Sequence, residues 1–541
     1  MSTPTTTPTT SKDHRSTSRI DRFLNTIEWL GNKLPEPFAL FLGLFLITAV
    51  LSTVMAWVDV SVQVPGSDET LHVQGFFTAA GLTWFTTTMA ENYIGFPPLL
   101  TVLPIMLGVG VAERSGMLSA LIRQLFGSAR KWVLPYAVGV VGVTASVMAD
   151  AAWVVVPPLA AMVFKAAGRH PVAGLLGGFA SVGAGYSTAL VPTSLDALFA
   201  GITNAVMDPM PNLGATAVNV LSNYYFNIVA AVLLGVVAGF LIDKVLEPRM
   251  WKTNVPTEQV ENGAAQENTQ ANTEDDDQHA NISPQLSTDE KRGLWWSLAS
   301  VVVLTGIVLA SVLPEASPWR NEDGGFLPES PLLDSVVFLI FAYFLLMGVV
   351  YGIAVGTIRS TGDMVSMMSK AMGSILGFLV LAFILGQFIA LFNWSGIGTW
   401  TAVVGAAGLE SIGLTSFPAI IAFIILCSCV NLLIISGSGM WTLMAAVFVP
   451  MFALLGFEPA FIQAAFRVGD SATQVITPLN PFMILIIGML RKYEPEAGLG
   501  TLISRMLPFV VPFWLTWVML LAVWYFVDLP LGPGVGIFIE G

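Results

Sequence analysis

The chain contains 541 residues, of which 55% are hydrophobic and only 11% are charged, and its formal net charge is −13 at pH 7. This balance excludes a soluble globular protein and predicts a polytopic protein whose surroundings are the lipid bilayer. Much of the excess acid falls in residues 254–290, which indicates a solvated segment, and nothing suggests a nucleic-acid partner.

Residues 1–35 are Thr-rich and then basic, without the apolar segment of a signal peptide, so a cytoplasmic tail is expected. Seven apolar runs follow that are long enough to cross a bilayer. They cover residues 37–58, 97–112, 224–242, 294–313, 332–354, 372–392 and 507–527. Two further segments, 172–203 and 460–490, are each expected to begin and end on opposite sides, which brings the predicted crossings to about nine.

Two remaining segments, 133–164 and 415–457, are expected to return to the side that they left. The first is interrupted at Asp150 and the second at the tip Ser436-Gly437-Ser438-Gly439. Polar, Gly-rich backbone at mid-depth is tolerated only where protein or a water-filled cavity surrounds it. We therefore predict an all-α membrane protein with two re-entrant helical hairpins, although each segment is also long enough for two ordinary spans.

Lys and Arg are concentrated in alternate loops, and the side that holds them is expected to be cytoplasmic. Residues 59–75, 204–223, 393–413 and 528–541 hold neither. We expect a multi-pass protein of a bacterial inner (plasma) membrane, with its N-terminus in the cytoplasm and its C-terminus outside. An acidic cytoplasmic linker, 251–293, joins a first membrane half, 36–250, to a second, 294–541.

The two halves contain an internal repeat. "GYSTALVPTSLD" (185–196) aligns without a gap with "GDSATQVITPLN" (469–480), at a constant offset of 284 residues. Upstream, "GRHP" (168–171) matches "GFEP" (456–459), and "VVPPLAAM" matches "FVPMFALL". The first G-x-x-P turn has basic neighbours and the second has none, so the repeats are predicted to be inverted.

The span in each repeat is predicted to break. Residues 460–490 would form a helix of about 46 Å, longer than the roughly 30 Å hydrocarbon core. Pro478 and Pro481 remove backbone donors and clash with the preceding turn. Inverted repeats with a broken helix in each half are typical of secondary transporters, which bind substrate and ions near the midplane.

At these residues the sequence resembles the AbgT family of bacterial transporters. The likeness spans nearly all of 20–535 and includes "GVGVAERSGMLSALIR", "ADAAWVVVPPLAAMVFKAAGRHP", "SGSGMWTLMAAVFVPMF" and "RVGDSATQVITPLNP". It implies nine spans, two hairpins and a homodimer that transports p-aminobenzoyl-glutamate, or a folate-derived or sulfonamide-like compound. It also implies functional roles for Asp196, Ser438, Trp441, Arg467, Asp470 and Pro478.

Arg467 and Asp470 lie three residues apart, on one face of a helix. Ionisable residues within a span are costly and usually mark a transport pathway. Arg467 offers the planar fork that binds carboxylates, as an anionic substrate requires. Asp470 is expected to hold Arg467 while the site is empty and to help bind substrate or a coupling ion. A purely structural ion pair is the alternative.

Three further residues are candidates for ion coupling. Asp196 aligns with Asn480, so that a carboxylate in one half faces an amide in the other, although Asp196 would also suit a helix cap. Asp150 at the first hairpin tip is the third. The coupling ion is expected to be a proton, carried better by Asp196 than by Asp470. Sodium near Asp196, Asn480 and Ser438 is the alternative, and no other cofactor or metal is expected.

Ser438 and Trp441 lie three residues apart, just after the second hairpin tip. Trp441 is expected to stack on an aromatic substrate and Ser438 to donate to a carboxylate, whereas a lone Trp is otherwise often an interfacial anchor. The chain is thus expected to be a secondary active transporter, not an enzyme, that works by alternating access of its hairpin-containing core. A channel or a membrane enzyme is the alternative, but no H-E-x-x-H or G-x-S-x-G pattern is present.

Overall fold

The computed structural model describes residues 36–63, 70–127, 129–259, 285–327, 330–434, 436–477 and 480–539. The N-terminal tail, most of the acidic linker and Pro478 lie outside these ranges. The described chain is mostly helical, as predicted. Its one regular strand pair is β1 (Ser61–Gln63) with antiparallel β2 (Thr70–His72), in which Val62 faces Leu71.

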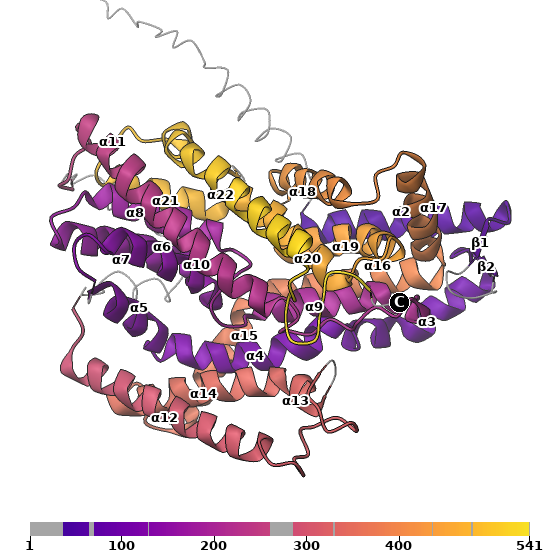
Figure 1. The fold of residues 1–541 in the computed structure, drawn as a ribbon, viewed down its shortest axis with the longest axis horizontal. Coiled ribbons are helices and arrows are strands. Elements are labelled where there is room, and N and C mark those ends of the chain that lie inside the picture. Colours follow the sequence, from indigo (N-terminus) through magenta and orange to yellow (C-terminus); the bar gives the residue numbers. More distant parts are fainter. Residues whose placement is uncertain are drawn as a thin grey trace, which may run out of the picture.

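The helices before the linker include both arms of the first hairpin, α6 and α7, and both parts of the first broken span, α8 and α9 (Figure 1). In chain order they are α2 (Pro37–Trp57), α3 (Ala79–Ile94), α4 (Pro97–Arg114), α5 (Met117–Gly127), α6 (Leu134–Thr144), α7 (Ala151–Ala166), α8 (Pro171–Ala184), α9 (Ser194–Met207), α10 (Tyr224–Leu241) and α11 (Glu247–Lys252).

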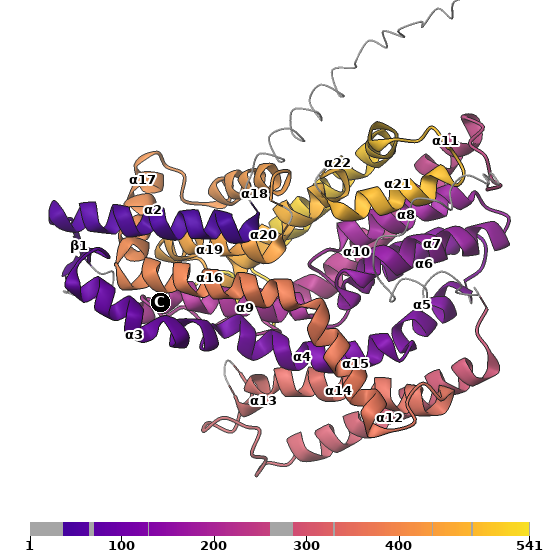
Figure 2. The ribbon, with the colours of Figure 1, turned by 180° about the vertical axis from the view of Figure 1, so that it is seen from behind.

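The helices after the linker include the second hairpin, α18 and α19, and the second broken span, α20 and α21. In chain order they are α12 (Thr288–Val312), α13 (Pro331–Asp334), α14 (Val336–Val355), α15 (Thr361–Ser374), α16 (Leu376–Trp394), α17 (Ile397–Ser411), α18 (Phe417–Asn431), α19 (Gly437–Leu454), α20 (Pro459–Thr473), α21 (Pro481–Arg491) and α22 (Leu499–Val527). Figures 1 and 2 show α12 and α14 as a pair along one side of the molecule, next to α4.

Nine helical stretches of the described chain are long and apolar enough to cross a membrane, which agrees in number with the prediction. Their identities differ in one place. The predicted crossing 172–203 is made of two 14-residue helices, α8 and α9, whereas the hairpin arm α19 is long enough to count. Sequence analysis also overlooked α3, which continues into α4, and took the region of α17 for a loop.

Both predicted breaks are present. In the first repeat, residues 185–193 separate α8 from α9. In the second, α20 ends at Thr473, one turn of 3₁₀ helix covers Gln474–Ile476, and α21 begins at Pro481. Pro481 stands at the first position of its helix, where a missing N–H costs nothing. The spans therefore break where the Gly-rich and Pro-rich repeat motifs lie.

Equivalent positions of the two repeats touch each other. Ser187 and Ser471 occupy equivalent repeat positions 284 residues apart, and their hydroxyl oxygens lie 3.0 Å from each other in a hydrogen bond. The helices that follow the two broken spans, α10 and α22, also pack together, with the rings of Phe226 and Trp517 5.7 Å apart. Contact between two copies of one position supports the predicted internal repeat.

The outer end of each broken span is fastened by the segment that follows the next helix. Arg169, in the first G-x-x-P turn, forms ion pairs with Asp243 and Glu247 just after α10. In the second turn, the Gly456 carbonyl accepts a hydrogen bond from the Ile539 amide (2.9 Å), in the tail after α22. The two halves thus share an arrangement that extends beyond the aligned motifs.

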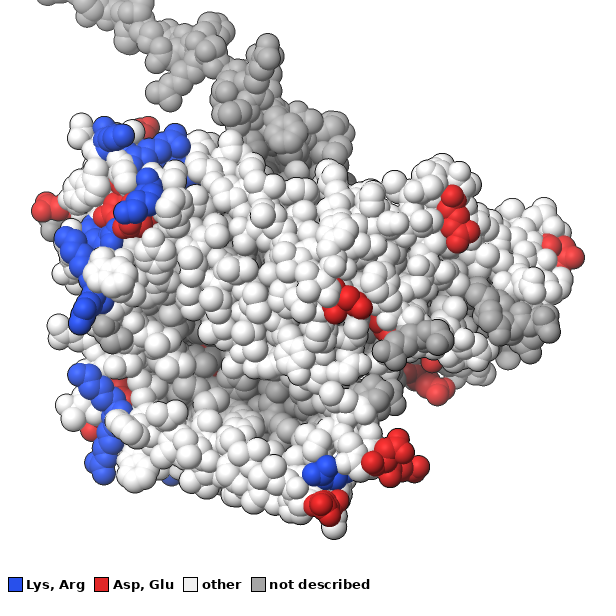
Figure 3. Space-filling model, viewed as in Figure 1, with Lys and Arg blue, Asp and Glu red and all other residues white. Residues whose placement is uncertain are grey.

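Charged side chains are unevenly distributed over the surface (Figure 3). Lys and Arg gather at the end of the molecule that carries α11 and the start of α12, including the exposed Lys244, Lys252 and Lys291. Most charges at the opposite end are acidic. The fold therefore places at one end the basic segments that sequence analysis assigned to one side.

Glycines allow the outer arm of the first hairpin to approach α10 closely. A Cβ atom on Gly139 would lie 2.0 Å from the Gly235 carbonyl oxygen, and one on Gly239 would lie 2.5 Å from the Cα of Tyr136. Gly235 and Gly239 are four residues apart on α10, which is the spacing that lets membrane helices pack backbone to backbone. This contact holds the hairpin against the helix that follows the first broken span.

We expect Gly235→Ala to separate α6 from α10, because the added Cβ would lie 2.6 Å from the Cα of Val140. Overpacking of this kind costs about 1–3 kcal/mol, so the thermal midpoint of the detergent-purified protein should fall. Gly306→Ala is the matched control, since its Cβ meets nothing within 4 Å. An equal midpoint for both variants would show that the close packing is not needed.

Candidate functional site

Both hairpin tips and both broken spans line one cavity of about 470 Å³. The first tip contributes Ala149 and Asp150, and the second contributes Ser436, Gly437 and Ser438. Tyr186 and Ser194 line the cavity from the first break and the helix start that follows it. Gln474 and Asn480 line it from the second break. Four segments that are far apart in the sequence therefore meet where the repeat architecture predicts a binding site.

Four helices begin at the wall of this cavity. They are α7 after the first tip, α19 at the second tip, and α9 and α21 after the two breaks. The N-terminus of a helix carries partial positive charge and N–H groups without helical partners. No Lys or Arg is among the described residues that line the cavity. The arrangement therefore favours an anionic group without presenting a cationic side chain.

One wall of the cavity is aromatic. Trp153 from the first hairpin and Phe482 from the second repeat have ring centroids 5.7 Å apart and planes only 5° from parallel. Tyr186 and Phe378 also line the cavity. Gly437 lies against Tyr186, because a Cβ at this glycine would be 2.9 Å from the tyrosine ring. Trp153 is only 2% exposed and packs on Phe179 and Phe482. The half-buried rings of Tyr186, Phe378 and Phe482 are therefore the faces on which a flat aromatic ligand would stack.

Arg467 and Asp196 form a buried ion pair that joins the two repeats. The Arg467 Nη2 and Asp196 Oδ1 atoms are 2.8 Å apart, and the side chains are 1% and 4% exposed. Arg467 also donates to the backbone carbonyl of Ser187, within the first break. The expectation that Asp470 would hold Arg467 is therefore wrong. Asp470 was expected to be the partner because it lies three residues from Arg467 on the same helix. The packing of the two repeats instead places Asp196 beside the guanidinium.

Asp196 is held by its own helix as well. Its Oδ2 atom accepts hydrogen bonds from the Thr193 amide (2.7 Å) and hydroxyl (2.8 Å), which completes a capping box at the start of α9. The Asn227 side chain donates to Oδ1 from 3.1 Å. The helix-cap alternative considered for Asp196 is thus present together with the ion pair. Both carboxylate oxygens of Asp196 therefore have hydrogen-bond donors.

Asp470, unlike Asp196, has no hydrogen-bond donor at its carboxylate among the described residues. Its side chain is fully buried. Asn431 donates to the Asp470 backbone carbonyl from 2.6 Å, while its own Oδ1 atom has no partner in the described chain. The Oε1 atom of Gln474, one turn further along, is likewise unpartnered. Buried acceptors of this kind are costly unless a proton or a cation satisfies them.

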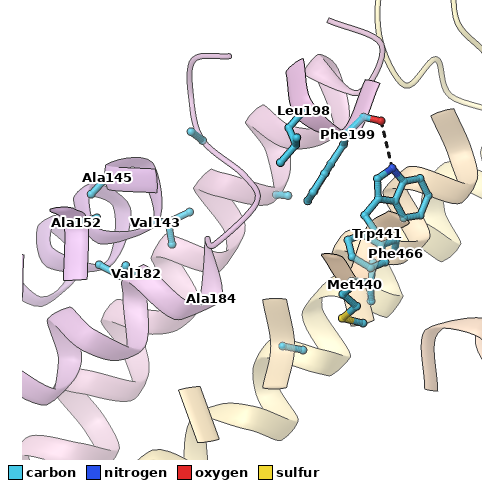
Figure 4. Close-up of a cluster of buried hydrophobic side chains, with 14 of the residues drawn as sticks. Val143, Ala145, Ala152, Val182, Ala184, Leu198, Phe199, Met440, Trp441 and Phe466 are labelled. Carbon is cyan, nitrogen blue, oxygen red and sulfur yellow. Dashed lines mark hydrogen bonds between the residues drawn. The ribbon is translucent and has the colours of Figure 1, made fainter. Parts of the chain in front are cut away.

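Trp441 is buried in the core and does not line the cavity (Figure 4). Its indole N–H donates to the Phe199 carbonyl (3.2 Å) and to the Thr203 hydroxyl (3.2 Å). Its ring packs on Phe466 with a centroid distance of 4.6 Å. In this structure Trp441 therefore joins the second hairpin to α9, and the expected stacking on a substrate has no support here.

The structure separates the predicted site residues into two groups. Ser438, Asn480 and Asp150 line the cavity, whereas Asp196, Arg467, Asp470 and Trp441 lie in the packed protein around it. Pro478 lies outside the described residues. Within the described chain, no group of three or more His, Cys, Asp and Glu residues could hold a metal ion. The sodium site predicted near Asp196, Asn480 and Ser438 is thus divided between the two groups.

Three cavity residues, Trp153, Gln474 and Phe482, are not singled out by any pattern used above. A signal was available for Trp153, which follows the first tip residue Asp150 at the same three-residue spacing that drew attention to Ser438 and Trp441. Gln474 and Phe482 flank the second break. Their orientation depends on how the chain unwinds between α20 and α21, which local patterns do not specify.

His170, in the first G-x-x-P turn, is fully buried and far from being a solvated loop residue. Its Nε2 atom lies 3.0 Å from the Val255 carbonyl oxygen, to which it donates. Burial holds the pKa of His170 below its usual value, so the ring is neutral at pH 7. His170 thus fastens the end of α11 to the turn and lies outside the cavity lining.

We expect Asp196→Ala to destabilise the protein strongly, because it leaves the Arg467 guanidinium buried without its partner. Removing one member of a buried pair costs about 3–5 kcal/mol. Arg467→Met alone should cost a similar amount, and the double variant should recover part of it. Thermal unfolding in detergent measures all three. Additive losses in the double variant would show that the two side chains do not depend on each other.

Comparisons with known proteins agree with this architecture. Residues 22–539 match the model of the AbgT putative transporter family. The chain is 36% identical, over 96% of its own length and 98% of the relative, to the p-aminobenzoyl-glutamate transport protein of Escherichia coli (strain K12).

Two solved structures are similar over most of the chain. The YdaH transporter of Alcanivorax borkumensis, described as having an unusual topology, is 36% identical with a TM-score of 0.83 over 92% of this chain and all of that chain. MtrF of Neisseria gonorrhoeae, placed in a class of antimetabolite efflux pumps, is 35% identical with a TM-score of 0.84 over 95% of this chain and all of that chain. The chain therefore belongs to the AbgT transporter family.

Proposed function

We propose that this protein is a secondary active transporter of small anions that carry an aromatic ring, with p-aminobenzoyl-glutamate or a close relative as substrate. One observation carries the proposal: the hairpin tips and the helix breaks of both repeats line a single cavity, as expected if the repeats are inverted. Inverted repeats that meet in this way provide two related conformations, which open the same site to opposite sides of the membrane.

The chemistry of the cavity supports this substrate class. The helix N-termini that lie away from Asp150 favour carboxylates, and the half-buried rings of Tyr186, Phe378 and Phe482 favour a flat ring. The name of the Escherichia coli relative and the antimetabolite class of the Neisseria protein point to compounds of the same kind. Transport in either direction is compatible with one site, because the imposed gradients decide the direction of net flux.

A channel is the main alternative. A channel needs a continuous path across the membrane. It needs neither movement of one half against the other nor a carboxylate that takes up a coupling ion. The enclosed position of Asp470 favours coupled transport, because an unpartnered buried carboxylate is costly when charged. An enzyme is disfavoured by the relatives, which are named as transporters.

We propose that Asp470 is the coupling carboxylate and that Asp196 is a structural partner of Arg467. This reverses the roles expected from the sequence, because both carboxylate oxygens of Asp196 already have donors whereas those of Asp470 have none among the described residues. The ion is a proton or sodium. The neighbouring oxygens of Asn431 and Gln474 are ligands that a hard cation accepts.

We also propose the expected setting in the membrane. The protein would lie in a bacterial inner membrane as a homodimer, with the basic end of the molecule in the cytoplasm. The two hairpins would be re-entrant, with their tips at the cavity from opposite sides. Alternating access would then arise from movement of the hairpin-containing core, together with α10 and α22 that pack on it, relative to the remaining helices.

Purified protein in liposomes should accumulate labelled p-aminobenzoyl-glutamate when a proton or sodium gradient is imposed. Asp470→Asn should lose this accumulation while still exchanging labelled for unlabelled substrate, because the amide resembles a carboxylic acid that cannot release its proton. Asp208→Asn, at the exposed end of α9, is the matched control. Continued accumulation by Asp470→Asn would disprove the coupling role. Flux that ignores both gradients and does not saturate would point to a channel.

The orientation can be tested by labelling single cysteines in a background without Cys427 and Cys429, which are both free thiols. Thr253 and Glu322 are exposed near the basic and acidic ends, respectively. A membrane-impermeant thiol reagent applied to spheroplasts should label Glu322→Cys and reach Thr253→Cys only after lysis. The reverse pattern would place the basic end outside.

A further inference from the structure

We propose that the cavity holds its ligand in one orientation, with an aromatic amino group donating to Asp150 and carboxylates facing the second tip, Ser436–Ser438. The inference rests on the proposed function and deepens it, since it assigns each end of the ligand to one hairpin. Inverted repeats would by themselves give a cavity with two similar ends. The side chains at the two tips make these ends chemically different.

The first tip presents a carboxylate without a partner. Asp150 lines the cavity, is accessible, and its side chain makes no hydrogen bond or ion pair with any other described residue. The preceding residue, Ala149, has φ 46° and ψ −127°. This backbone conformation is costly for a residue with a Cβ, and such costs cluster at functional sites. The strained turn aims an anionic acceptor at the ligand space, where a donor N–H is the group that it would bind.

The second tip presents only donors and neutral groups. The hydroxyl oxygens of Ser436 and Ser438 lie 3.1 Å apart, and α19 begins at Gly437 between them. A Cβ atom on Gly437 would lie 2.9 Å from the Tyr186 ring, so the second tip packs directly against the first break. A carboxylate fits here because hydroxyls and the helix N-terminus donate to it. The same carboxylate would be repelled at the first tip by Asp150.

The aromatic wall connects the two ends. Trp153 stands one helical turn after Asp150 on α7, and its ring is parallel to Phe482. Trp153 is buried, so the half-buried Phe482 is the ring of this pair that a ligand can reach. A ligand ring stacked on Phe482 would have its amino substituent near Asp150. The unpartnered Nδ2 donor of Asn480 and Oε1 acceptor of Gln474 lie on the second break, beside the cavity. They are suited to the carbonyl and N–H of an amide that follows the ring.

The inference predicts the ligand class: an aromatic amine with a carboxylate at its other end. Two compounds test it, p-aminobenzoyl-glutamate and benzoyl-glutamate, which differ only in the amino group. Wild-type protein in liposomes should prefer the amine about tenfold or more in apparent affinity, because the lost hydrogen bond has a charged acceptor. Competition of each compound with labelled substrate measures the preference.

Asp150→Ala should reduce the preference to near unity by weakening p-aminobenzoyl-glutamate alone. Asp150→Asn keeps a weaker acceptor and should give an intermediate preference, so the test does not depend on one variant. Ser438→Ala should weaken both compounds equally, since both retain the glutamate. Asp208→Ala, exposed and outside the cavity lining, should leave both unchanged.

Two results would overturn the inference. One is an unchanged preference in Asp150→Ala. The other is an equal loss of both compounds in Asp150→Ala and Asp150→Asn, which would assign Asp150 to coupling or to structure. A wild-type protein that transports neither compound would instead refute the proposed function itself, so the two failures are distinguishable.

Discussion

The ion pair between Arg467 and Asp196 is the interaction on which the centre of the molecule depends. Unwinding a helix inside a membrane exposes backbone groups that lipid cannot satisfy. Arg467 meets this need in the first repeat by donating to the Ser187 carbonyl while it binds Asp196, which completes the capping box of α9 with Thr193. One side chain of the second repeat therefore stabilises the break of the first. The first half thus depends on the second to keep its broken helix in this form.

Symmetry and its departures have separate roles in this fold. The equivalent residues Ser187 and Ser471 touch, and α10 packs against α22, so the frame of the molecule follows the repeat. The chemistry at the centre does not. Asp150 stands at one tip and serines stand at the other, while Asp196 and Asn480 share an aligned position but have different partners. The frame suits movement between two similar conformations, and the differences suit a ligand with two unlike ends.

The sequence was informative wherever the physical cause is local. Proline and glycine positions predicted both breaks, and the aligned motifs predicted the repeat. Contacts between the two repeats could not be predicted from the sequence. The spacing of three residues suggested Asp470 as the partner of Arg467. The observed partner is Asp196, because the two repeats pack with these distant segments side by side. Likewise Trp153 and Trp441 both follow a hairpin tip by one turn, and only packing decides that Trp153 borders the cavity and Trp441 the core.

The fastening of the two G-x-x-P turns has a mechanical consequence. Each broken span is anchored at its outer end, through Arg169 to Glu247 in one half and through Gly456 to Ile539 in the other. Its inner end stops at an unwound segment beside the cavity. A helix that is anchored at one end and unwound at the other can rotate as a rigid body about its anchored end. Displacements of an ångström or less at a filled cavity would then be transmitted as rotations about the anchored turns, with the amplitude set by the length of α8 or α20.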